Sequence, residues 1–110
     1  MSSNPASLLS PQYVISDLTS TSQQVTVEPK YMNVSRVIVD NTLGTTAAFV
    51  TSGEASTTAV FPTSATAASL GSIVGPGSVQ TYTRNPKHGF IAAIRETGTA
   101  DLLIKLSSGE

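Results

Sequence analysis

Short runs in which apolar and polar residues alternate recur along this chain, with turn residues between them. Alternation is clearest at Val25 and Val27 in residues 23–29, at Val37 and Val39 in residues 35–41, and at Val79, Thr81 and Thr83 in residues 78–84. Side chains of a strand point alternately to its two faces, so a period of two predicts strands with one buried face. Apolar-rich runs of strand length also occupy residues 46–52, 57–64, 89–95 and 100–106.

The turn residues predict how these strands connect. Residues 41–44 (Asn-Thr-Leu-Gly) favour a hairpin between residues 35–41 and 46–52. Gly98 offers a left-handed position for a hairpin that joins residues 89–95 and 100–106. Both of those runs are apolar on both faces, so we expect this hairpin to be central in the fold. The Ala/Ser/Thr-rich residues 64–72 have too little bulk for more than a loop with at most a short strand.

These runs predict an all-β fold, a small antiparallel β-sandwich or jelly-roll-like domain of seven or eight short strands. No segment shows the pattern of an amphipathic helix, and β-branched residues are abundant. A length of 110 residues fits one domain. Residues 1–22, rich in Ser, Thr, Pro and Asn, predict an extended N-terminal arm, and residues 23–110 the single domain.

Composition narrows the classes of partner. Charged residues make up 12% of the chain and the formal net charge is −1, which provides no basic surface for nucleic acid or for an anionic membrane. The chain has no cysteine, which excludes disulfides, thiolate metal sites and a cysteine nucleophile. Residues 1–12 lack the basic region and apolar run of a secretory signal, and no stretch reaches transmembrane length, so we expect residence in a cytoplasm.

No motif predicts a reaction, a cofactor site or a metal site. His88 is the only histidine and lies in a loop-like stretch, and the seven acidic residues are dispersed. Serines and threonines make up 31 of 110 residues, which leaves a serine nucleophile open, but no Gly-x-Ser-x-Gly elbow occurs. The glycine-containing residues 71–77 lack the lysine and helix of a phosphate loop. We therefore expect a protein that is not an enzyme.

Two segments are candidates for binding a partner. The arm carries small apolar anchors, Leu8, Leu9, Tyr13 and Ile15, although a tail that frays in solution is equally compatible with its composition. The only local basic cluster consists of Arg84, Lys87 and His88. It is suited to an acidic partner surface, and the alternative is a solvated turn between two strands.

The order of three stretches resembles a known family. They are RVIVDNTLGTTAAFV at residues 36–50, VGPGSVQTYTR at 74–84 and HGFIAAIRETGTADLLIKLSSGE at 88–110. Together they resemble the small β-sandwich virion proteins of tailed bacteriophages, in particular capsid decoration (cement) and auxiliary head proteins, over about residues 34–110.

The resemblance implies a non-enzymatic structural protein on the capsid surface of the virion, made in the cytoplasm of the bacterial host. Its implied partners are the major capsid protein or other virion subunits, and its implied state is a homo-oligomer, a dimer or a trimer. Two alternatives remain, an adaptor module of the neck, tail or fibre and a carbohydrate-binding sandwich. The second would require exposed aromatic rings, and the chain has three Tyr, three Phe and no Trp.

Overall fold

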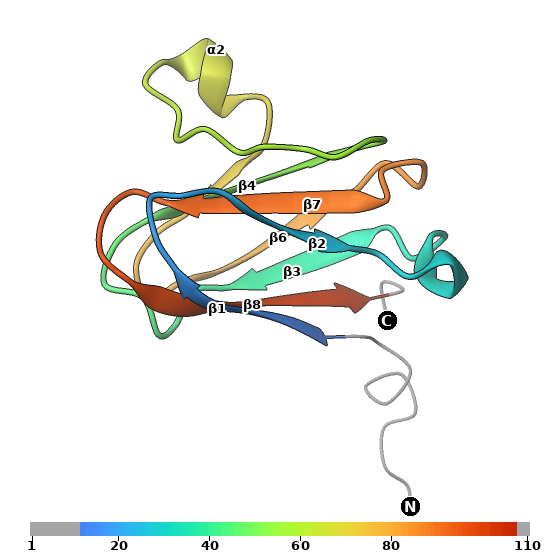
Figure 1. Cartoon of the computed structure of the whole chain (residues 1–110), viewed down its shortest axis with the longest axis horizontal. Helices are drawn as coiled ribbons and strands as arrows, with labels where there is room; N and C mark the ends of the chain where they lie inside the picture. The colour runs from blue at the N-terminus through green and yellow to red at the C-terminus, as the bar shows by residue number, and fades with distance from the viewer. Residues whose placement is uncertain (1–11, 108–110) are drawn as a thin grey trace, which may run out of the picture.

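The structure, a computed structural model, describes residues 12–107, which form two four-stranded antiparallel sheets that pack face to face (Figure 1). Sheet A has the strand order β1-β8-β3-β6, and sheet B has the order β2-β7-β4-β5. The strands are β1 (Gln12–Leu18), β2 (Gln23–Thr26), β3 (Arg36–Asp40), β4 (Ala48–Gly53), β5 (Ser72–Val74), β6 (Val79–Thr83), β7 (Phe90–Arg95) and β8 (Ala100–Ser107). A 3-10 turn, η1 (Pro29–Tyr31), and a short helix, α2 (Ala65–Ala68), lie in connections.

The strand pairs are nested in sequence. The pair β4·β5 is enclosed by β3·β6, that pair by β2·β7, and that pair by β1·β8, all of them antiparallel. The chain therefore follows one long hairpin that is folded over into two sheets, which is the strand arrangement of an eight-stranded jelly roll. The predicted all-β sandwich is confirmed.

The inward faces of both sheets form the main hydrophobic core. Val37 and Val39 of β3 alternate with outward side chains, and so do Leu102, Ile104 and Leu106 of β8. Sheet B contributes, among others, Val50, Ile91 and Val74. Because facing sheets pack about 10 Å apart, one layer of side chains from each sheet fills the interior.

Both predicted hairpins are wrong. β3 lies in sheet A and β4 in sheet B, so residues 41–47 cross from one sheet to the other. β7 and β8 are likewise in different sheets, although Gly98 does have the left-handed conformation expected of it (φ 77°). Turn residues show that the chain reverses but do not show whether the next strand pairs with the previous one. β7 and β8 are interior strands of their sheets, as their apolar faces indicated.

The predicted boundary between arm and domain is also corrected. Residues 12–18, assigned to the arm, form β1, which pairs with β8 at the edge of sheet A. Ile15 and Leu18 belong to the main core. Three apolar residues in a row, Tyr13 to Ile15, were too short a signal beside the surrounding Ser, Thr and Pro. Residues 1–11, with Leu8 and Leu9, lie outside the described residues.

Residues 57–64, predicted to be a strand, have no strand structure. They belong to a connection, residues 54–71, which passes over the outer face of sheet B and includes α2. Its backbone is held by side chains, because Thr57 N donates to Gln24 Oε1 (2.7 Å) and Ala59 N donates to Ser22 Oγ (2.8 Å). Helix α2 begins where Ser64 Oγ accepts a hydrogen bond from Ala67 N.

Candidate functional site

The connection 54–71 and the outer face of sheet B enclose a second, smaller hydrophobic cluster. Ala92 and Ile94 point outward from β7, Phe49 points outward from β4, and Ala59 covers them. Phe61 packs against Phe49 edge to face, with ring centroids 6.5 Å apart. Both faces of sheet B are therefore covered, which explains why β7 is apolar on both faces.

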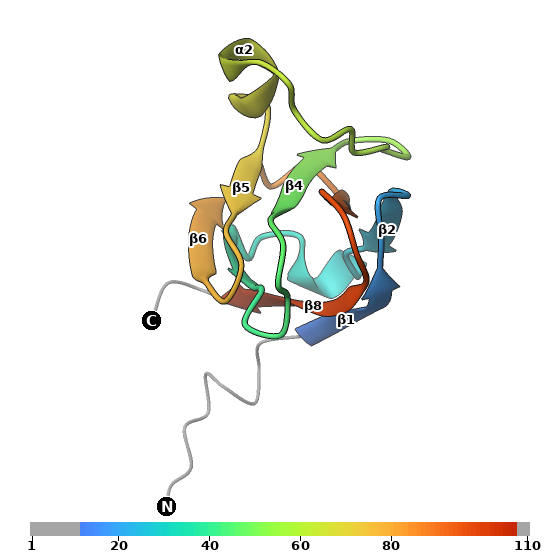
Figure 2. The ribbon, with the colours of Figure 1, turned by 90° about the vertical axis from the view of Figure 1, so that its left-hand side faces the viewer.

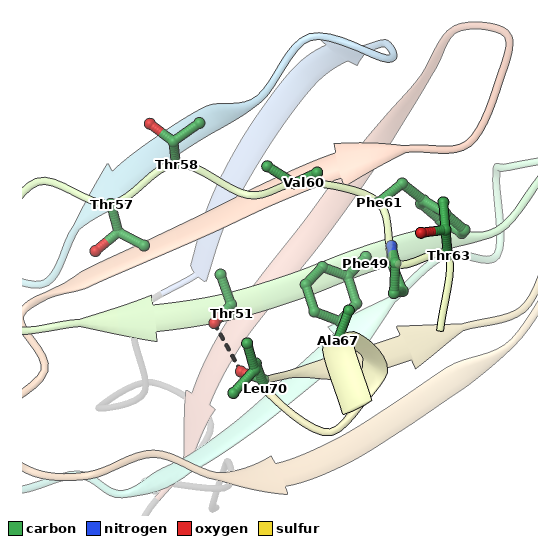
Figure 3. A pocket seen from close by; sticks show the side chains of 10 residues that line it. Phe49, Thr51, Thr57, Thr58, Val60, Phe61, Thr63, Ala67 and Leu70 are labelled. Carbon is green, nitrogen blue, oxygen red and sulfur yellow. Dashed lines mark hydrogen bonds between the residues drawn. The ribbon is translucent and has the colours of Figure 1, made fainter. Parts of the chain in front are cut away.

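A groove of about 300 Å³ opens beside this cluster. Its wall consists of Phe49, Phe61 and Pro62 with Ala67 of α2. Figure 3 shows Phe49 next to Ala67, between β4 and α2. Val60 and Leu70 line it as well, and they are 72% and 74% exposed. The remaining lining residues are threonines, so no charged side chain lines the groove.

The outer face of sheet A is not covered by any of residues 12–107 (Figure 2). One row of neighbouring outward residues crosses its four strands: Val14, Leu103, Asp40 and Val79. Val14 is 51% exposed and Val79 is 52% exposed. The adjacent row contains Lys105 and Ile38. This face, called here the sheet A face, combines aliphatic groups with charges of both signs.

Arg84 is fully buried at one end of the sandwich. Its guanidinium donates to carbonyl oxygens of residues 31–34, which follow β2, and of residues 85–88, which follow β6. The shortest of these bonds are to Val34 O (2.6 Å) and His88 O (2.7 Å). Burial lowers the pKa of Arg84. Arg84 thus joins two connections and presents nothing to a partner.

At the opposite end of the sandwich, the side chains of Arg95 and Asn41 also donate hydrogen bonds to backbone carbonyl oxygens, and both residues are buried. Arg95 donates from Nε to Leu18 O (3.1 Å) and from Nη1 to Thr46 O (2.9 Å). Asn41 Nδ2 donates to the same Thr46 oxygen (2.9 Å) and to Gly75 O (3.0 Å). Burial lowers the pKa of Arg95.

The structure separates the predicted binding residues. Ile15 and Arg84 are buried and cannot form a binding surface, which corrects both assignments. Tyr13 is half-buried against the core, and its hydroxyl accepts a hydrogen bond from Glu28 N (3.4 Å). Lys87 is exposed and His88 half-buried in the connection that Arg84 holds. The three basic residues therefore do not form one basic surface.

The His88 side chain shares a hydrogen bond of 2.8 Å between its Nδ1 and Ser52 Oγ. A serine that hydrogen-bonds to a histidine is the smallest arrangement in which a hydroxyl nucleophile has a general base beside it. In the described part of the chain, no carboxylate hydrogen-bonds to this histidine to orient it. The pair joins the end of β4 to the connection after β6, and we assign it a structural role.

Tyr82, beside Arg84, has a buried hydroxyl without a hydrogen-bond partner in residues 12–107. Burial raises its pKa, and the charge of Arg84 opposes this only in part. The unfolded chain releases the phenolic proton near pH 10, whereas the folded chain retains it, so stability should fall above that pH by up to about 1.4 kcal/mol per pH unit.

Tyr82→Phe is therefore expected to leave stability at pH 7 unchanged or raised, and to reduce this alkaline loss. Urea unfolding at pH 7 and above pH 10 measures both effects. Tyr31→Phe is the control, because it keeps Tyr82 and should retain the wild-type pH dependence. A clear loss of stability in Tyr82→Phe at pH 7 would show that the hydroxyl has a partner.

Sequence reasoning missed the two surfaces described above. The sequence predicted a strand at the groove residues Val60 and Phe61, and a loop with at most a short strand at Leu70. Their signal was the presence of large apolar side chains in a segment otherwise rich in Ala, Ser and Thr. The row on the sheet A face could not be found, because β1 was not recognised.

Within residues 12–107, no three His, Asp or Glu side chains lie close enough together to hold a metal ion. The same part of the chain contains no helix long and apolar enough to cross a membrane. No model of a known protein family matches the sequence, and no curated protein sequence matches it.

Proposed function

We propose that this protein is a non-enzymatic structural component of a phage particle that binds the assembled capsid and stabilises it. The observation that carries the proposal is the eight-stranded jelly roll, an architecture used by viral capsid domains as well as by lectins and cupins. The resemblance of residues 34–110 to phage decoration proteins favours the first of these uses. Fold alone does not define function, so the proposal also depends on which side chains the protein exposes for binding.

The surface that we assign to the capsid is the sheet A face. It exposes Val14 and Val79 beside the half-buried Ile38 and Leu103, whereas the opposite face of the sandwich is covered by residues 54–71. Asp40 and Lys105 lie on the two central strands beside these aliphatic side chains, so the face offers a partner both apolar and charged contacts. Many copies on one shell multiply a modest affinity.

Carbohydrate binding is less well supported. A sugar ring stacks on an open aromatic face, but Phe49 is only 3% exposed and its ring is packed against Phe61. An adaptor of the neck, tail or fibre would use the same fold in fewer copies, so copy number distinguishes it from a decoration protein.

Quantitative peptide mass spectrometry of particles purified from the source of this protein measures that number. A ratio to the major capsid subunit near one, or near one-third, is expected for a decoration protein spread over the shell. About a dozen copies per particle would instead support the adaptor, and absence from the particle would refute the proposal.

Val79→Asp is expected to weaken binding to empty shells by about tenfold or more, because it replaces an exposed aliphatic contact by a second carboxylate next to Asp40. Leu43→Asp is the matched control, since Leu43 is 63% exposed but lies in the connection between β3 and β4. Co-sedimentation of each variant with shells gives the affinities. Equal binding by the two variants would remove the sheet A face from the interface.

A further inference from the structure

The groove over sheet B has the chemistry of a site for an uncharged, apolar segment of chain. Its wall is aromatic and aliphatic, and Val60 and Leu70 expose most of their surface to solvent beside it. Exposed apolar side chains gathered at a concave surface commonly mark a binding site.

The threonines of the groove add little polarity. Thr51 Oγ1 donates to Leu70 O (2.9 Å), shown as the dashed line in Figure 3, and Thr57 Oγ1 donates to Ala55 O (2.6 Å). These two hydroxyl protons are therefore already used within the chain. A charged ligand would lose its hydration there without gaining a charged partner.

The protein itself contains a segment with matching chemistry. Residues 1–11, MSSNPASLLSP, have no charged side chain, and their bulk is concentrated at the adjacent Leu8 and Leu9. The segment precedes Gln12, the first residue of β1, at the edge of sheet A.

The groove of the same chain is too far away for these leucines. Leu8 is four residues before Gln12, and four residues span at most about 14 Å. The groove lies beyond the far side of sheet B, and facing sheets alone are separated by about 10 Å. Figure 2 shows β1 and the α2 connection on opposite sides of the sandwich, so a path around the sheet edge is longer still.

We propose that residues 1–11 of one copy bind in the groove of a second copy, with Leu8 and Leu9 against Phe61 and the exposed side chains of Val60 and Leu70. Donor segment and acceptor groove are different surfaces, so the exchange is either reciprocal within a two-fold dimer or continues head to tail into a ring or a chain. This exchange extends the proposed function by connecting neighbouring copies, and it is tested on the purified protein without shells, so either proposal can fail alone.

Paramagnetic relaxation between two populations of the full chain tests the contact directly. The chain has no cysteine, so Ser7→Cys provides a single attachment site for a spin label. Spin-labelled chain at natural isotope abundance is mixed with an equal amount of unlabelled ¹⁵N chain, in which only contacts between copies broaden signals. We expect broadening of the amides of Thr58, Val60 and Leu70.

Matched variants separate the two sides of the contact. Leu8→Ser with Leu9→Ser in the labelled chain, or Val60→Asp in the ¹⁵N chain, should abolish the broadening, whereas Val79→Asp on the opposite face should retain it. Sedimentation velocity should show self-association of the wild type that the double leucine variant weakens by about 100-fold. Val60 and Val79 are exposed, and ¹⁵N spectra verify that each variant is folded.

Three outcomes would overturn the proposal. The first is a wild type that remains monomeric at millimolar concentration, which leaves the groove without this occupant. The second is broadening of the groove amides only when label and ¹⁵N are in the same chain, which would mean that the segment binds its own groove. The third is broadening between copies at the sheet A face instead of the groove.

Discussion

Replacing Arg84 by methionine is expected to lower the free energy of unfolding by about 4 kcal/mol. Methionine fills much of the space but cannot donate to the carbonyl oxygens that the guanidinium binds. The oxygens left without this donor belong to Tyr31, Met32, Val34, Asn85, Pro86 and His88. Because small domains are stable by only about 5–15 kcal/mol, part of the variant population should unfold under mild conditions.

Urea denaturation measures this effect as a decrease of roughly 2–4 M in the midpoint, for a slope of about 1–2 kcal/mol/M. Arg36→Met is the control, because Arg36 is exposed on the sheet A face and the same substitution there should cost less than about 0.5 kcal/mol. Arg84→Lys should fall between the two, since one ammonium has three donors on a compact head. Equal midpoints for Arg84→Met and Arg36→Met would contradict the role assigned to Arg84.

The second large effect is expected for Gly44→Ala, which should destabilise the fold by about 3 kcal/mol. A Cβ at position 44 would overlap Asn41 Oδ1 and a terminal nitrogen of Arg95. Both side chains are fully buried or nearly so and are held by carbonyl oxygens, so neither can move away without losing hydrogen bonds.

Gly75→Ala is the matched control, because Gly75 lies in the connection between β5 and β6, next to Asn41. A Cβ there meets only Ser78 Oγ, at an ordinary contact distance of 3.6 Å. We expect this variant to unfold within about 0.5 kcal/mol of the wild type, by heat or by urea. If Gly44→Ala were equally well tolerated, the Asn41 and Arg95 side chains would have to be adaptable rather than fixed.

The strands were predicted where alternation was strong, and the reason for each failure is physical. Residues 35–41, 78–84, 89–95 and 100–106 all contain a strand close to the predicted bounds. In residues 35–41 the alternation reflects burial of one face, whereas residues 89–95 are apolar on both faces because both faces of sheet B are covered. In β6 the alternating Val79, Thr81 and Thr83 lie on the exposed face instead, and Tyr82 packs against the core. Burial of a face is a local property of a strand. Partner choice is not local, so a turn such as residues 41–44 predicted a hairpin where the chain in fact crosses between sheets.

The candidate sites were harder to predict than the strands. Arg84 lies beside Asn85, Pro86 and Lys87, which is the composition of a solvated turn. Its burial depends on carbonyl oxygens of residues 31–34, about fifty positions away in the sequence. The groove likewise requires residues 54–71 to fold back over β4, which no short-range pattern indicates.

The pairing of β1 with β8 has a consequence for how the chain folds. Gln12 lies opposite Lys105, and β8 is the strand that holds both β1 and β3 in sheet A. Sheet A therefore cannot be completed until β8 has been synthesised, and its assembly requires closing a loop of about ninety residues between β1 and β8. Such a high contact order favours slow folding, on a timescale of roughly milliseconds to seconds. Until then, the apolar strands of the growing chain remain exposed to other polypeptides.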